Sequence, residues 1–272
     1  IKGEIQKMTK ETDQLIVNTQ TIHELIKTGK RLDGRSLTDY REPITVQTEV
    51  SWTAEGSAMV QIGETKVIVG VKLSLEKPYA DTADQGGIMI NAELLPLSSP
   101  IYNPGPPGMK AIEMARVLDR GIRESHAIDL KKLCITPGEK AWFVIMDIVS
   151  VNDDGNLFDA AGLALLAALK TARFPTVKED GSLDYKNKTE EKLPLLKQPI
   201  SITVLKINGA LVIDPTAEEE FSADARLTVA VDVNGTISAM QKGGDATLTL
   251  EDVDGMVGLA LEKADFLRGK LE

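Results

Sequence analysis

The hydrophobic positions near the start of this chain recur with the period of a helix. Leu15, Ile22, Leu25 and Ile26 lie near helical spacing, and Gly29 follows them as a stop signal. We therefore predict a helical leader over about residues 1 to 30.

A period of two begins at residue 44 and predicts strands. The expected strands are residues 44–46, 58–62, 66–73, 88–94 and 142–151, with a hairpin at Gly63–Glu64 between the second and third. A loop rich in Pro and Gly occupies residues 100–108, and a helical period returns from about Ala111 to His126. The last strand leads directly into an Ala/Leu-rich helix.

The C-terminal third repeats this order of strands and then a helix. Residues 175–199 are polar and carry three prolines, which predicts a linker. Asn208–Gly209 and Asn234–Gly235 each predict a hairpin with a type I′ turn. A final amphipathic helix is expected from Leu250 to Leu267. Hairpins followed by a helix on both sides of the linker favour two similar α+β halves.

Composition narrows the class of protein. The chain has 272 residues, of which 42% are hydrophobic and 26% charged, as in ordinary soluble globular proteins. No apolar run is long enough to span a bilayer, and no signal-peptide region is evident. The single Cys134 suits a reducing compartment. We therefore expect a cytoplasmic protein with no membrane partner. Two histidines and one cysteine are too few for a zinc site, and we predict no bound metal. The net charge of −10 disfavours a surface coated for nucleic acid but leaves room for a local basic patch.

Residues 153–170, DDGNLFDAAGLALLAALK, have the shape of an anion site. A glycine turn runs into a helix, where free N–H groups and the helix dipole favour a phosphate. The turn offers Asn156, Leu157, Phe158 and Asp159 instead of the Ser, Thr, Lys or Arg of phosphate-binding loops. A carboxylate at Asp159 can also cap the helix itself. Without other information, a capped core helix is the preferred interpretation.

Acidic residues gather between the two late hairpins. They are Asp214, Glu218, Glu219, Glu220 and Asp224. Clustered carboxylates suit Mg²⁺ or Mn²⁺, but they are equally typical of a solvated loop in an acidic protein, and composition favours the loop.

The helix at 111–126 carries a basic face. Arg116, Arg120 and Arg123 follow one another at spacings of four and three. Such a row can follow a phosphate backbone. It can equally be a surface of ion pairs, since Asp119 with Arg123 and Arg120 with Glu124 are both four residues apart. The residues alone leave both interpretations open.

Three segments together resemble RNase PH-like proteins. They are RLDGR at 31–35, GPPGMKAIEMARVLDRGIRESHAIDL at 105–130, and the glycine turn with its helix. The resemblance covers about residues 24–268 and is strongest to the non-catalytic RNase PH-like subunit of the archaeal exosome. It implies an α+β, RNase PH-like fold of two βαβ-containing halves with mixed sheets and packed helices. The expected division is a leader at 1–38, a first half at 39–190 and a second half at 191–272.

The resemblance also implies that catalysis has been lost. Active members use inorganic phosphate to release nucleoside diphosphates from RNA 3′ ends, with a phosphate loop similar to GGTRTA. Here its Thr-Arg-Thr core is replaced by Leu157, Phe158 and Asp159. In the acidic pair of active members, Glu220 matches the first acid and Arg226 the second, while Asp224 lies two residues out of register. Arginine can neither bind a metal nor act as a general acid. A double arginine before the central helix is replaced by Met109 and Lys110.

The resemblance therefore implies that this chain supports a catalytic partner subunit and needs no cofactor. The resemblance implies an alternating hexamer, with three copies each of this chain and a catalytic RNase PH-like subunit, together with RNA-binding cap subunits. The chain would structure its partner's active site and contact RNA through Arg116 and Arg120, with Arg123 and Lys110 as further candidates. The alternative is an active phosphate-dependent 3′-to-5′ exoribonuclease. A free-standing RNA-binding module is disfavoured by the acidic balance and an aromatic content of 4%.

Overall fold

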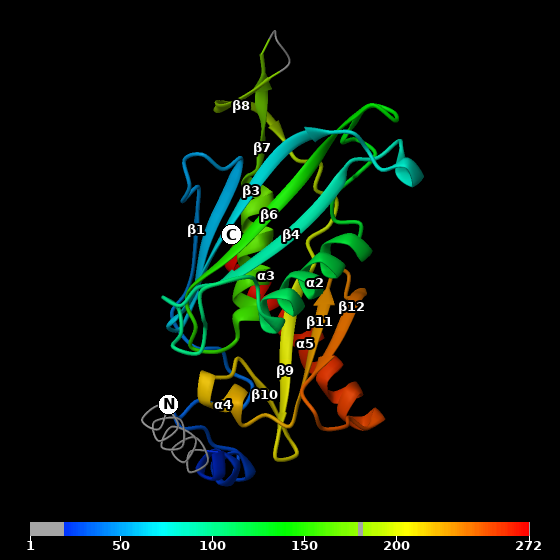
Figure 1. Ribbon diagram of the computed structural model, residues 1–272. Coiled ribbons are helices and arrows are strands. Elements are labelled where there is room, and N and C mark those ends of the chain that lie inside the picture. The colour runs from blue at the N-terminus through cyan, green and yellow to red at the C-terminus, as the bar shows by residue number, and fades with distance from the viewer. Residues whose placement is uncertain (1–18, 179–181, 272) are drawn as a thin grey trace.

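The computed structural model describes residues 19–178 and 182–271, and its larger sheet is built mainly from the first half of the chain (Figure 1). The strands run in the order β1-β2-β3-β6-β4, and β5 pairs with β6. Their bounds are Ile44–Thr48 for β1, Gly56–Ile62 for β2, Thr65–Glu76 for β3, Gly87–Leu94 for β4, Cys134–Thr136 for β5 and Lys140–Asn152 for β6. All pairs are antiparallel except β4 with β6. The helix α2 (Met109–Glu124) connects that parallel pair, so β4, α2 and β6 form a βαβ unit.

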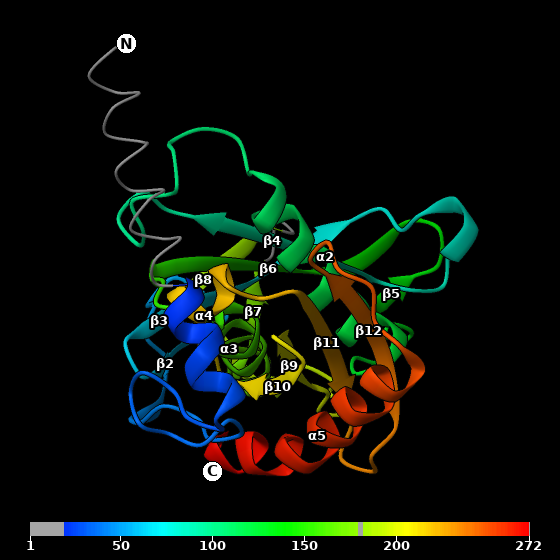
Figure 2. The ribbon, with the colours of Figure 1, turned by 90° about the horizontal axis from the view of Figure 1, so that it is seen from below.

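The helix α3 (Leu157–Thr171) lies between the two sheets. It contacts β2 and β3 on one side and β9 on the other, and Figure 2 shows it nearly end-on in the centre of the molecule. Every residue from Leu157 to Leu169 is buried. A helix that is hydrophobic all round is stable only in such a fully enclosed position.

The smaller sheet is built from the C-terminal part of the chain. Its order is β10-β9-β11-β12, and all its pairs are antiparallel. The elements are β9 (Ile200–Ile207), β10 (Ala210–Ile213), α4 (Ala217–Phe221), β11 (Ala225–Val231), β12 (Ile237–Gly243) and α5 (Leu250–Arg268). Figure 2 shows α5 on the face of this sheet opposite to α3. Short 3₁₀ turns occupy Ala80–Thr82 and Gly269–Leu271.

The predicted leader is helical where the structure describes it. Residues 19–27 form a helix, whose Ile22 and Ile26 pack against Leu205, Ile207 and Val212 of the smaller sheet. Residues 1–18, which include Leu15, lie outside the described residues.

The segment predicted to be a linker contains a hairpin. The strands β7 (Arg173–Val177) and β8 (Leu183–Lys192) form a two-stranded sheet that extends from one end of the molecule (Figure 1). Most side chains of β8 are exposed. Because such a strand buries neither face, it lacks the alternation that would have predicted it.

The two Asn-Gly turns differ. Asn208 and Gly209 both have positive φ, 48° and 83°, as the predicted type I′ turn requires. In the second turn only Gly235 has positive φ, 73°. Its N–H donates to the carbonyl of Asp232, and a bulge follows in the pairing of β11 with β12, so the predicted type I′ geometry is wrong here.

The α+β class with mixed sheets and packed helices is confirmed. The βαβ arrangement occurs only in the first half, since the smaller sheet is antiparallel throughout the described residues. In the part of the chain that the structure describes, no helix has the length and apolar character needed to cross a membrane.

Candidate functional site

The glycine turn that has the shape of an anion site lies where β6 ends and α3 begins. Gly155 has a φ of 88° and Asn156 a φ of 56°. A Cβ atom on Gly155 would lie 2.5 Å from the carbonyl oxygen of Pro215. A side chain is therefore impossible without backbone movement, and glycine lets the turn press against the segment that leads into α4.

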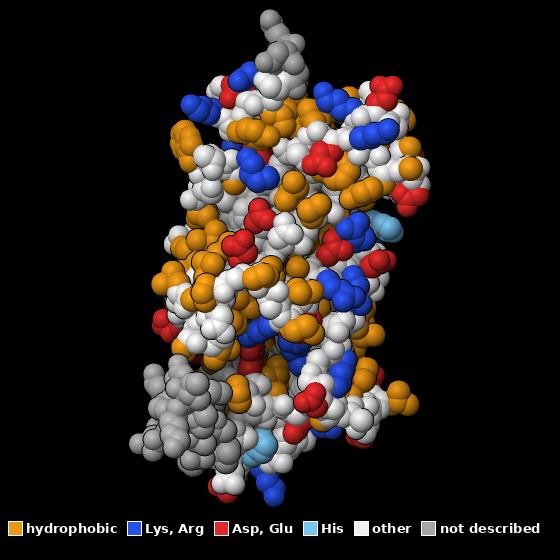
Figure 3. Space-filling view, viewed as in Figure 1, with side chains coloured by type: hydrophobic (Ala, Val, Ile, Leu, Met, Phe, Trp, Pro, Cys, Tyr) orange, Lys and Arg blue, Asp and Glu red, His pale blue; other side chains and the backbone are white. Residues whose placement is uncertain are grey.

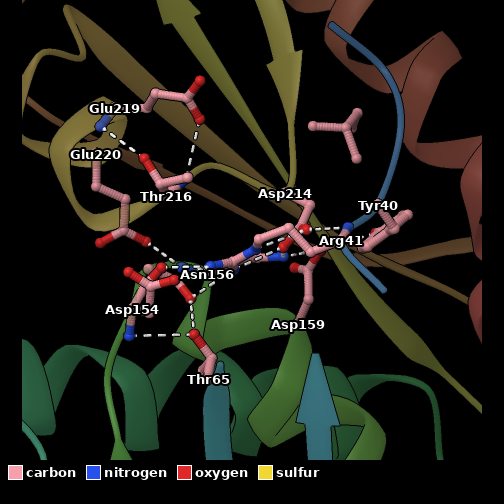
Figure 4. Close-up of polar contacts among 12 residues, drawn as sticks. Tyr40, Arg41, Thr65, Asp154, Asn156, Asp159, Asp214, Thr216, Glu219 and Glu220 are labelled. Atoms are coloured by element: carbon pink, nitrogen blue, oxygen red, sulfur yellow. Dashed lines mark hydrogen bonds and ion pairs between the residues drawn. The ribbon is translucent and has the colours of Figure 1, made fainter. Parts of the chain in front are cut away.

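A carboxylate of the protein already occupies the start of α3. The Asn156 N–H donates to Glu220 Oε1 at 2.7 Å, and Lys110 Nζ lies 3.3 Å from Glu220 Oε2 (Figure 4 shows the first contact). Lys110 also lies 3.3 Å from Asp153 Oδ2. Burial alone lowers the pKa of Lys110, but Glu220 and Asp153 raise it above its ordinary value. The Lys110 ammonium and the Asn156 N–H at the start of α3 are thus both bound by carboxylates of the protein.

Asp159 does not fill the anion's place, contrary to the expectation that its carboxylate caps the helix. Its side chain is fully buried and accepts hydrogen bonds from the Tyr40 hydroxyl at 2.9 Å and Asn156 Nδ2 at 3.1 Å. Burial raises the pKa of Asp159 to about 7, against hydrogen bonds from Thr203, Tyr40 and Asn156 that lower it. Desolvation therefore outweighs three donors. The residue that fills the place is Glu220, which lies on α4.

Arg41 and Asp214 form the centre of a buried network that the sequence did not predict. Arg41 donates from Nε and Nη2 to the two Asp214 oxygens at 3.0 and 2.9 Å, and its backbone N–H donates to the same carboxylate at 2.6 Å (Figure 4). Arg41 Nη2 also donates to the Gly155 carbonyl at 3.0 Å, and Asn156 Nδ2 donates to Asp214 Oδ1 at 2.8 Å. Both charged side chains are almost fully buried. The network joins the entry to β1, the glycine turn and the smaller sheet.

Phe158 and Arg226, which the resemblance matches to a phosphate-loop residue and an acid of active members, contact one another. The Arg226 guanidinium carbon lies 4.1 Å from the centre of the Phe158 ring, a cation–π contact. Arg226 Nη2 pairs with Glu113 Oε1 at 2.5 Å. Leu157 is buried in the core. The residues predicted to form a degenerate phosphate loop and a degenerate acidic site therefore contact one another, through the Phe158 ring of α3 and the Arg226 guanidinium of β11.

The acidic residues do not converge. Asp224 Oδ2 accepts the Asn208 N–H at 2.7 Å and so stabilises the turn between β9 and β10. Glu219 is buried against Arg31, whose Nε donates to it at 2.9 Å. Among residues 19–178 and 182–271, no group of three or more His, Cys, Asp or Glu side chains could hold a metal ion. The interpretation as an acidic metal site is thus unsupported, although the loop is not simply solvated.

The four predicted cations of α2 have different surroundings. Arg116 is exposed and makes no hydrogen bond or ion pair with the residues that the structure describes. Arg120 Nη2 donates to Gln241 Oε1 at 2.5 Å, so it is not paired with Glu124 as the spacing allowed. Arg123 pairs with Asp119 at 2.7 Å, as predicted. Lys110 is bound at the start of α3 as described.

Arg116 and Arg120 line a groove. The groove has a volume of about 360 Å³ and runs between α2 and Gln241 of β12. The other lining residues are Met109, Lys110, Ile112, Glu113 and Val117. Figure 3 shows Lys and Arg side chains beside apolar ones over α2 on this face. Gln241 is not predicted from the sequence, in which its only signal is that it is a polar residue within a strand.

Comparisons with known proteins agree with this architecture. Residues 40–175 match domain 1 of the 3′ exoribonuclease family, and residues 197–263 match its domain 2. A protein of Methanocella arvoryzae called exosome complex component Rrp42 is 47% identical over 251 residues, which cover 92% of this chain and 94% of that protein. Its namesake in Thermococcus onnurineus is 45% identical and covers 91% of each.

The solved structures agree as well. A chain of the Archaeoglobus fulgidus exosome with RNA bound to the active site superposes with a TM-score of 0.89 at 40% identity, covering 95% of this chain and 99% of that chain. A chain of an archaeal exosome core gives a TM-score of 0.85 at 37% identity, covering 96% and 99%. Both exoribonuclease domains and the whole fold are thus matched, and the chain belongs to the 3′ exoribonuclease family of RNase PH-like proteins.

Proposed function

We propose that this chain is a structural, RNA-contacting exosome subunit that performs no phosphorolysis of its own. Its relatives at 45–47% identity are called exosome components, and the matching folds come from archaeal exosomes, one of them with RNA bound. In this role the chain structures the active site of a catalytic RNase PH-like partner and adds cations to the path of the RNA.

The observation that carries the proposal is the filled site at the start of α3. The Glu220 carboxylate accepts the N–H that a phosphate would need, and Arg226 covers Phe158 where a carboxylate would be required. Phosphoryl transfer depends almost wholly on positioning and on charges aimed at the reacting groups. A site that repels phosphate and lacks its acid supplies neither.

The RNA contact rests on Arg116 and Arg120. They lie one helical turn apart and line the same groove, as a row along a phosphate backbone would. Arg123 and Lys110 are weaker candidates than the spacing suggested, because each is held by acids of the protein.

The two other functions have less support. Phosphorolysis by this chain would need Glu220 and Asp224 to act together, but Asp224 is engaged by the turn at Asn208. A free-standing RNA-binding module would need stacking aromatics, and among the residues that the structure describes no aromatic side chain lines the groove.

The proposed assembly follows the resemblance. Three copies of this chain alternate with three catalytic subunits in a ring, to which RNA-binding cap subunits attach. A division into a leader, a first half to residue 190 and a second half from residue 191, and a cytoplasmic location, remain part of this proposal.

The experiment is a trimming assay with RNA and inorganic phosphate. The purified chain alone is expected to release no nucleoside diphosphate, whereas the chain mixed with its catalytic partner should form a complex that does. The partner alone serves as the control for what the complex adds. Diphosphate release by the chain alone, lost on substitution of Glu220, would establish the rival enzyme instead.

A further inference from the structure

Arg116 is unpaired although two acids lie within its reach. Glu113 precedes it by three positions on α2, and Asp119 follows it by three. Side chains three apart on a helix are neighbours, and opposite charges at that spacing attract. Arg116 nevertheless makes no ion pair with any described residue, and both acids pair with other arginines.

Glu113 is held by the second half of the molecule. Arg226 of β11 pairs with it at 2.5 Å while its guanidinium lies on the Phe158 ring. Gly243, directly opposite Arg226 on β12, makes this position possible, because a Cβ atom there would lie 2.6 Å from Arg226 Nη2. The guanidinium is thus fixed between a ring, a glycine and an acid.

Asp119 is held from within α2 itself. Arg123 donates to its two carboxylate oxygens at 2.9 and 2.7 Å. The same guanidinium donates to the Ile88 carbonyl of β4 at 3.1 Å, which anchors it away from the groove. Arg123 does not line the groove.

We propose that Arg226 and Arg123 are positioning residues that hold Glu113 and Asp119 and so keep Arg116 free to bind a polyanion. The inference rests on the proposed function, in which the polyanion is the RNA backbone. Arg226 then does more than stand in place of an acid, because it holds Glu113. Arg123 holds Asp119 and does not itself contact the RNA. Without these two arginines, Arg116 would pair with an acid of its own helix.

The test measures what Arg116 contributes to RNA binding in three backgrounds. The probe is a fluorescein-labelled oligoadenylate, bound to the complex with the catalytic partner in phosphate-free buffer. In the wild-type background, Arg116→Ala should weaken binding on the order of tenfold, as for a charge-assisted contact, and reduce the salt slope by about 0.7. In an Arg226→Gln background the same substitution should cost only about fourfold, because the pair with Glu113, which at this spacing is worth about twofold, then competes with the RNA for Arg116. Adding Glu113→Gln to that background should restore the full loss.

A second series guards against misfolding, since Arg226 packs on Phe158. Arg123→Gln should also reduce the cost of Arg116→Ala, and Asp119→Asn should restore it; Arg123 is 44% exposed, so its loss is tolerable for the fold. An undiminished cost of Arg116→Ala in both Arg226→Gln and Arg123→Gln backgrounds would overturn the inference and leave the proposed RNA contact intact. If Arg116→Ala had no effect on RNA binding in the wild-type background, the proposed RNA contact of Arg116 would be wrong, and the inference that rests on it would be wrong as well.

Discussion

The start of α3 and the groove along α2 are both places where the chain presents charge, and they differ in what that charge meets. At α3 each ionised group has an internal partner: Lys110 has Glu220, and Arg41 has Asp214. In the groove Arg116 has none among the described residues, and Arg120 donates to two neutral acceptors, the Gln241 amide oxygen and the Met240 carbonyl. Charges that neutralise one another stabilise the fold, whereas an unpaired charge remains available to a ligand. The charges at the start of α3 are therefore neutralised within the fold, whereas Arg116 in the groove has no counter-charge among the described residues.

The largest effect is expected from breaking the network at α3. Asp214→Ala should lower the free energy of unfolding by about 3–5 kcal/mol, because it leaves the buried Arg41 guanidinium without its counter-charge. Burial opposes the charge of Arg41, and Asp214 is the main group that raises its pKa above the ordinary value. Urea denaturation followed by circular dichroism measures the loss.

The matched control is Asp265→Ala. Asp265 also pairs with an arginine, Arg268, but its side chain is 83% exposed. The control should change stability by at most about 0.5 kcal/mol. Equal effects of the two substitutions would show that the buried network contributes no more than a surface pair.

The next effect concerns pH. Asp159 has a folded pKa of about 7, above its ordinary value, so the folded state holds a proton that the unfolded state releases between about pH 4 and pH 7. This group therefore adds stability as pH falls through 7, by about 2.5 kcal/mol between pH 8 and pH 5. Asp159→Asn, neutral at every pH, should lack this part of the dependence. A variant with the same pH profile as the wild type would mean that Asp159 is ionised in the fold at pH 7.

A smaller effect separates Glu220 from its neighbours on α4. Glu220→Ala removes the acceptor of the Asn156 N–H and one partner of Lys110, and should cost about 1–2 kcal/mol. Glu218→Ala, on the exposed side of the same short helix, is the control and should be nearly neutral. Differential scanning calorimetry compares them. Identical melting temperatures for the two variants would remove Glu220 from its place at the start of α3.

Much of the fold was predictable because hydrophobic periods report burial. The helix α2, the final helix and the strands of the larger sheet other than β5 show hydrophobic periods that predict them, whereas β5, with three residues, is too short to show one. The hairpin β7–β8 lies in the segment predicted to be a linker, because the mostly exposed side chains of β8 show no hydrophobic period. The turn at Asn234–Gly235 lacks type I′ geometry, and the pairing of β11 with β12 shifts register between Ala230 and Val231. The Asn-Gly dipeptide alone does not report such a shift.

The candidate site was predictable only in part. The spacing of Arg116 and Arg120 placed them on one face, and the resemblance identified the altered loop. No local pattern could bring Glu220 to Asn156, which is 64 residues away, or Arg41 to Asp214, which is 173 away. Proximity in sequence makes Asp159 the expected cap of the helix, whereas in the fold the Glu220 carboxylate of α4 accepts the Asn156 N–H.

The most direct test of the comparison puts both regions into one reconstituted complex and measures phosphate-dependent RNA trimming. This chain would carry either Arg116→Glu with Arg120→Glu, or Glu220→Ala, beside an unaltered catalytic partner; Lys131→Glu, at a 73% exposed side chain, controls for the change of charge. We predict that the double arginine variant loses trimming by about tenfold or more while Glu220→Ala and Lys131→Glu trim at the wild-type rate. Trimming that survives the loss of both arginines but fails with Glu220→Ala would contradict the account.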